Sequence, residues 1–130
     1  MINQKKKSDL KKLTLDFSKI IFAIVSELEK VPNKRNKIIF KKLRNDLDKL
    51  MESKIRPEEE NIIWVHVNLG VIGSFDFPAM QMGKGNTLDL FTLEDLVLFS
   101  YYWINRSVSG IFVDIGANIG LHSAVALQCG

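Results

Sequence analysis

The residues that could do chemistry gather near the end of the chain, in the stretch "IFVDIGANIGLHS" (Ile111–Ser123). Asp114 is the single charge in an otherwise apolar run, and a carboxylate buried there would cost free energy without a partner. Gly116 lets the backbone turn tightly and approach a ligand, and Gly120 lets the following helix pack closely. The pattern therefore indicates a ligand-binding loop between a strand and a helix.

The elements that must position this loop can be read on either side of it. Ile111–Ile115 lacks polar alternation, which is typical of a central parallel strand buried on both faces. Residues 121–129 carry apolar side chains at helical spacing. In such sheets the ligand lies beyond the carboxyl ends of the strands, and the helix N-terminus favours an anionic group.

The simplest alternative is a sharp turn in which the glycines serve geometry alone. The isolated charge of Asp114 argues against it, and so does Asn118, a polar residue that tolerates unusual backbone angles. The spacing is not G-x-G-x-x-G, so the dinucleotide fingerprint is absent, and the chain contains no phosphate-binding P-loop sequence.

The stretch "FVDIGANIGLHS" (Phe112–Ser123) resembles motif I of class I S-adenosylmethionine-dependent methyltransferases. Its D-I-G-A-N-I-G form is most similar to the FkbM family, whose members are mainly O-methyltransferases acting on sugars, polyketides and related compounds. The resemblance covers about residues 90–130. It implies the start of a Rossmann-like α/β sheet, S-adenosyl-L-methionine as cofactor, and a small-molecule or glycan hydroxyl as methyl acceptor.

The resemblance also implies a role for each loop residue. Asp114 would lie near the amino group of the cofactor's methionine part, and Gly116, Ala117, Asn118 and Gly120 would form the loop around it. Asn118 stands where many methyltransferases have another glycine, which is the FkbM-like variant. No catalytic residue follows from the resemblance.

Further residues that the family needs are absent from this chain. The family has an acidic residue after the second strand that holds the ribose hydroxyls, and later residues that bind the adenine and the acceptor. We therefore expect an N-terminal fragment of a larger methyltransferase, inactive by itself. The alternative is a non-catalytic fragment or helical interaction module whose glycine loop is purely structural.

A helical hairpin is expected over residues 1–57, ahead of this region. Apolar residues recur at helical spacing from Asp9 to about Lys30 and again from Ile39 to Met51. The break between them contains Pro32, which disfavours helix for the residue before it. The charged stretch "RPEEEN" is the expected boundary with a second domain, residues 61–130.

Short antiparallel strands are expected at the start of this second domain. "IIWVHVNLG" alternates cleanly between apolar and other residues, and Val71–Phe77 alternates less well. A short strand is expected at Leu88–Leu90. Thr92 and Asp95 have capping-box spacing ahead of a helix that ends near residue 105.

Charge and cysteine content limit the classes of function. The net charge is +6 over residues 1–60 and −3 over residues 61–130. The lysines alternate with acids, as on a solvated helix face, so we expect no nucleic-acid partner. The lone Cys129 excludes an intrachain disulfide and fits a cytoplasmic protein, and no apolar run is long enough to span a membrane.

The histidines carry weaker expectations. With His66 and His122 far apart in sequence and a single cysteine, no metal site is supported. His122, in the first helical turn after the loop, is expected to be exposed, although contact with the cofactor or acceptor is the alternative. His66 is expected to be solvated on the polar face of its strand. The sequence does not determine the oligomeric state.

Overall fold

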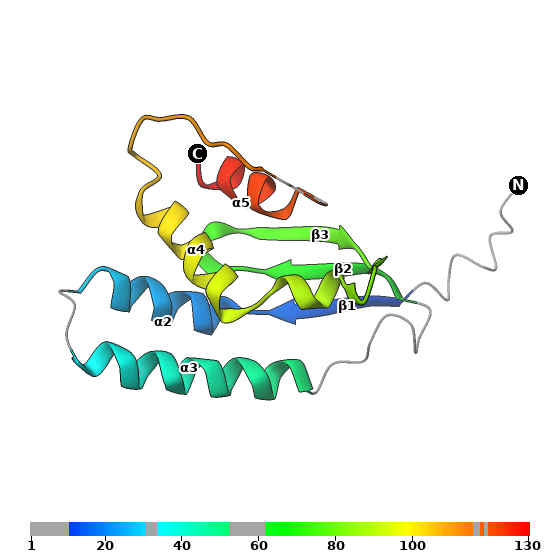
Figure 1. Cartoon of the computed structure of the whole chain (residues 1–130), viewed down its shortest axis with the longest axis horizontal. Helices are drawn as coiled ribbons and strands as arrows, with labels where there is room; N and C mark the ends of the chain where they lie inside the picture. The colour runs from blue at the N-terminus through cyan, green and yellow to red at the C-terminus, as the bar shows by residue number, and fades with distance from the viewer. Residues whose placement is uncertain (1–10, 31–33, 53–61, 116–117, 119) are drawn as a thin grey trace, which may run out of the picture.

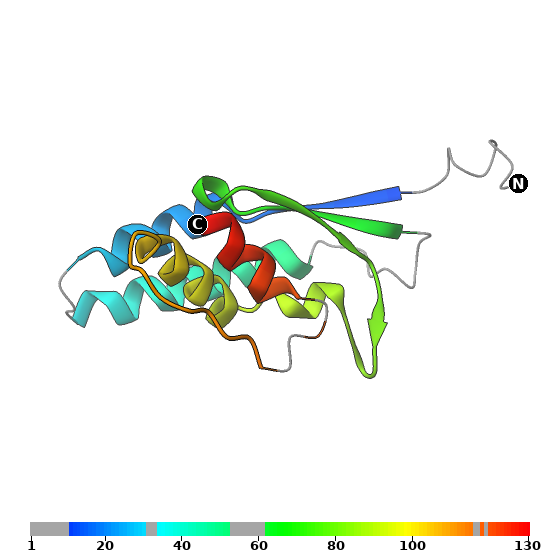
Figure 2. The same ribbon diagram turned by 90° about the horizontal axis from the view of Figure 1, so that it is seen from above.

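The computed structural model describes residues 11–30, 34–52, 62–115, 118 and 120–130, which form a mixed α/β fold (Figure 1). A three-stranded sheet lies along one side, with helices packed against one of its faces (Figure 2). The elements in chain order are β1 (Lys11–Asp16), α2 (Ser18–Leu28), α3 (Lys34–Glu52), β2 (Ile62–Asn68), the 3₁₀ helix η1 (Gly70–Ile72), β3 (Ser74–Pro78), β4 (Gln81–Met82), β5 (Gly85–Asn86), the 3₁₀ helix η2 (Thr87–Leu90), α4 (Leu93–Ile104) and α5 (Leu121–Cys129).

The first element differs from the sequence-based expectation, because residues 11–16 form strand β1 and not the first turns of a helix. Leu15 and Phe17 are fully buried, whereas Thr14 and Asp16, the residues that precede each of them, are exposed. This alternation is the period-two pattern of a strand. The helix begins only at Ser18, where Asp16 Oδ1 accepts hydrogen bonds from the Ser18 backbone N–H and hydroxyl.

The sheet has the order β1-β2-β3. β1 runs parallel to β2, and the connection between them contains α2 and α3, as a parallel crossover requires. β2 and β3 are antiparallel, with Val65 opposite Phe77 and Val67 opposite Phe75. The expected alternation of β2 is confirmed, since Val65 and Val67 are buried while Trp64 is 48% exposed.

A single apolar core joins the two halves of the chain. Its buried members come from β1, α2, α3, β2, α4 and α5 together. Phe17, which precedes α2, stacks on Phe91, which precedes α4, with 5.4 Å between ring centroids. The strand and helices of residues 11–52 therefore share one sheet and one core with the elements that follow residue 61.

Helix α4 begins as its sequence predicts. Thr92 and Asp95 form a reciprocal capping box, in which the Thr92 hydroxyl accepts from the Asp95 backbone N–H and the Asp95 carboxylate accepts from the Thr92 backbone N–H. The prediction of a strand at Leu88–Leu90 is wrong, because these residues belong to the 3₁₀ helix η2. This helix has its own capping box, formed by Asn86 and Asp89.

The expected central strand at Ile111–Ile115 is not formed. Residues 111–114 have no regular secondary structure, and Ile111, Val113 and Ile115 are 93%, 71% and 92% exposed. A strand needs a neighbour for its backbone groups. Here α5 lies between this segment, drawn in orange, and the edge strand β3 in both ribbon views (Figures 1 and 2).

Candidate functional site

The loop before α5 has the backbone conformation that its residue types allow. Asn118 has φ 55° and Gly120 has φ 78°, both in the left-handed region that favours glycine and asparagine. Gly120 is also the N-cap of α5, and no side-chain cap satisfies the first N–H groups of that helix among the described residues. Gly116 and Ala117, the other expected loop residues, lie outside the described part of the chain.

Asp114 lies against the start of α5. Its Oδ2 accepts a hydrogen bond from the Ser123 hydroxyl at 2.9 Å, so the carboxylate is held beside the first turn of the helix. The structure thus brings Asp114, Asn118 and Gly120 to one end of α5. A carboxylate beside an uncapped helix N-terminus offers one binding group for a cation and another for an anion.

His122 is not exposed as expected but joins α5 to α4. Its Nδ1 lies 3.0 Å from the Tyr102 hydroxyl, and its Nε2 lies 3.2 Å from Asp95 Oδ1. The imidazole also packs on the Phe99 ring, with centroids 5.0 Å apart. Burial raises the pKa of the Tyr102 hydroxyl, and the negative charges of Asp114 and Asp95 raise it further.

The sequence did not predict that Tyr102 and Asp95 contact His122. The available signal was their seven-residue separation, which places both side chains on one face of a helix two turns apart. Nothing in the sequence says that this face meets His122, because that contact depends on how α4 and α5 pack.

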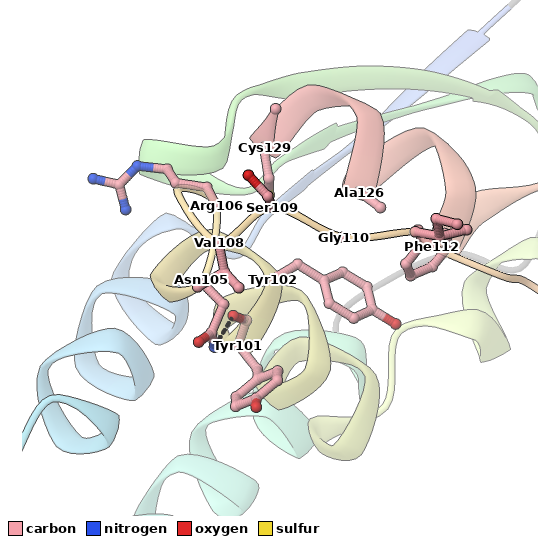
Figure 3. A pocket seen from close by; sticks show the side chains of 12 residues that line it. Tyr101, Tyr102, Asn105, Arg106, Val108, Ser109, Gly110, Phe112, Ala126 and Cys129 are labelled. Carbon is pink, nitrogen blue, oxygen red and sulfur yellow. Dashed lines mark hydrogen bonds between the residues drawn. The ribbon is translucent and has the colours of Figure 1, made fainter.

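A pocket of about 280 Å³ lies beside this network, between the C-terminal half of α4, the segment after it and α5 (Figure 3). Tyr102 and Phe112 contribute rings to its wall, with 5.3 Å between their centroids in an edge-on arrangement. Asn105, Arg106 and Ser109 add polar groups to its lining. The pocket is therefore mainly aromatic and apolar, with a few hydrogen-bonding groups.

Cys129 also lines this pocket, and it is a buried free thiol. Burial raises its pKa, which keeps the sulfur protonated and unreactive at neutral pH. We therefore assign Cys129 to packing.

His66 is less solvated than expected, because its Nδ1 lies 2.7 Å from Asp76 Oδ1. Lys12 Nζ lies 2.9 Å from the same oxygen, so the contact extends across all three strands of the sheet. Within the described residues, no group of three or more metal-ligating side chains could hold a metal ion. None of the described helices is both long and apolar enough to cross a membrane.

Comparisons with protein-family models, with curated proteins and with solved structures found no match to this chain.

Proposed function

We propose that this chain binds the cofactor of an S-adenosylmethionine-dependent O-methyltransferase of the FkbM kind, which has a Rossmann-like sheet. The observation that carries the proposal is the position of Asp114 beside the N-terminus of α5, where no described side chain caps the helix. The sequence resemblance of Phe112–Ser123 to motif I agrees with this position.

The chemistry of these groups fits the methionine part of the cofactor. Asp114 would bind its ammonium group, and the N–H groups at the start of α5 would bind its carboxylate. Asn118 and Gly120 turn the backbone around this end of the helix, and a Cβ added at Gly120 would meet no described atom within 4 Å.

S-adenosylmethionine supplies a methyl group on an electrophilic sulfonium when bound, so the protein mainly binds, orients and excludes water. A small molecule or glycan hydroxyl is the proposed acceptor. The mainly apolar pocket beside α4 is the described cavity that could receive part of such a molecule.

The test is a titration of the ¹⁵N-labelled chain with S-adenosylmethionine, followed by two-dimensional NMR. We expect the backbone signals of Asp114, Asn118 and Gly120 to move selectively. Asp114→Ala removes a hydrogen bond to a charged group, which is worth about 1.5–3 kcal/mol, or roughly 10–100-fold in affinity.

The matched control is Asp46→Ala, which removes an exposed carboxylate on α3 and should leave the titration unchanged. The proposal would be refuted if the chain is folded and the backbone NMR signals of the loop do not move when S-adenosylmethionine is added. So would an Asp114→Ala variant that binds as tightly as the original chain.

The second candidate function is an interaction module whose loop is only structural. It is favoured by the Asp114–Ser123 hydrogen bond, which gives the carboxylate a role in holding the loop against α5 without any ligand. Under this reading, Asp114→Ala lowers the free energy of unfolding, and S-adenosylmethionine leaves the loop signals unchanged.

A further inference from the structure

Asp95, His122 and Tyr102 form a continuous chain of hydrogen bonds between α4 and α5, which we call the relay. The distances are 3.2 Å from Asp95 Oδ1 to Nε2 of His122, and 3.0 Å from Nδ1 of His122 to the Tyr102 hydroxyl. The His122 and Asp95 side chains are 29% and 25% exposed, so water competes for these contacts only in part.

The capping box fixes where the protons lie. The other oxygen of Asp95, Oδ2, accepts from the Thr92 backbone N–H at 3.2 Å and from the Thr92 hydroxyl at 2.6 Å. An ionised carboxylate only accepts hydrogen bonds, so Nε2 of His122 must carry the proton that faces Asp95. Nδ1 of the neutral imidazole is then an acceptor, and the Tyr102 hydroxyl donates to it.

The relay also has a satisfied arrangement after it gains a proton. A protonated His122 donates from Nδ1 to the Tyr102 oxygen and from Nε2 to Asp95. Only the Tyr102 hydroxyl proton changes direction between the two states. The charges that act on the Tyr102 hydroxyl are those of Asp114, on the segment before α5, and of Asp95 on α4, and both are negative.

Tyr102, the last residue of the relay, is one of the residues that line the pocket. Tyr102 projects from α4 toward Phe112, and both residues line the cavity (Figure 3). The Tyr102 oxygen has lone pairs left to accept a hydrogen bond after its proton is donated to His122. The ligand that this arrangement fits is a small molecule that presents a hydroxyl donor.

We propose that His122 is the proton acceptor for the hydroxyl that is methylated, through Tyr102, and that Asp95 positions its ring. This inference rests on the proposed function. The acceptor O–H bond breaks as its proton passes to the Tyr102 oxygen, while the Tyr102 proton passes to Nδ1. The electron pair left on the acceptor oxygen forms the bond to the methyl carbon, and the carbon–sulfur bond breaks with its pair remaining on sulfur.

The experiment is nitrogen NMR of the full chain labelled with ¹⁵N-histidine, with His66→Gln used to assign the two imidazoles. We expect neutral His122 to hold its proton on Nε2. Phenol is the hydroxyl probe and benzene its matched control. Phenol should shift the Nδ1 signal of His122, and benzene should not.

Tyr102→Phe keeps the ring and removes the hydroxyl, so it should abolish the phenol-induced shift while the backbone spectrum stays native-like. A neutral His122 protonated on Nδ1 would overturn the relay, and this measurement needs no change in the relay residues themselves. A phenol shift that persists in Tyr102→Phe, or no shift in the original chain, would overturn it too.

The S-adenosylmethionine titration on the same sample separates the two proposals. Loop signals that respond to the cofactor, with no phenol response at His122, overturn the relay alone. If the loop signals do not respond to the cofactor, the proposed function is overturned. The role of His122 in methyl transfer is then overturned with it, even if phenol shifts the Nδ1 signal of His122.

Discussion

Backbone geometry and side-chain chemistry are divided between neighbouring residues at the start of α5. Asn118 and Gly120 provide the left-handed conformations, while Asp114, His122 and Ser123 provide the polar contacts. At Gly120 a side chain would strain the observed backbone, because its φ of 78° is one that L residues rarely adopt.

Gly120→Ala should lower the free energy of unfolding by about 1–2 kcal/mol, because a left-handed residue with a Cβ is strained. The matched control is Gly110→Ala, since Gly110 also has open space around it but has no left-handed φ. Urea unfolding monitored by circular dichroism measures both variants. Equal stabilities would show that α5 does not need a left-handed N-cap.

At the level of secondary-structure elements, the strands of the sheet are joined by side chains as well as by their backbones. One carboxylate oxygen of Asp76 on β3 contacts both Lys12 of β1 and His66 of β2. Hydrogen bonds from Lys12 and then from His66 lower the pKa of Asp76 below its usual range. The ionised form is therefore favoured in the folded state.

Because the folded-state pKa of Asp76 is lowered, its contribution to stability is present above the unfolded value of about 3.9. It is lost as the pH falls through the folded pKa. Asp76→Asn should thus be less stable than the original chain at pH 7, and the difference should shrink in strong acid. Urea unfolding over a pH series tests this.

The control for this series is Asp46→Asn on the exposed face of α3. A stability difference between Asp76→Asn and the original chain that stays constant from pH 7 into strong acid would contradict the assignment of Asp76 as the pH-dependent group. A stability difference that grows as the pH falls would contradict the lowered pKa of Asp76.

In the molecule as a whole, the first 52 residues and the rest depend on one another. β1 pairs with β2 over the register Lys12–Trp64 to Asp16–Asn68, and α2 packs against α4. Leu15, Ile21 and Ile24 are fully buried in the common core. Without them, β2 would lose its parallel neighbour and α4 would expose much of its apolar surface.

A chain of residues 61–130 alone should therefore lack a cooperative unfolding transition and give a poorly dispersed NMR spectrum. The physical reason is that unpaired backbone groups on β2 and lost apolar burial each oppose folding. The full chain, measured under the same conditions, is the control. A well-dispersed spectrum from residues 61–130 would instead support the division into two domains.

Much of the local structure follows from sequence because the relevant forces act between near neighbours. The alternation of β2, the capping box of Thr92 and Asp95, and the helical spacing of α5 were all readable. The loop was also readable, since glycine and asparagine are the residues that adopt left-handed φ at low cost.

The remaining features were decided by packing. Leu13 and Phe17 suit a helical stripe as well as an alternating strand, and only pairing with β2 makes residues 11–16 a strand. Ile111–Ile115 has the composition of a strand, but without a paired neighbour it stays irregular and exposed. The relay joins residues 20 and 27 positions apart, so it exists only because α4 and α5 meet.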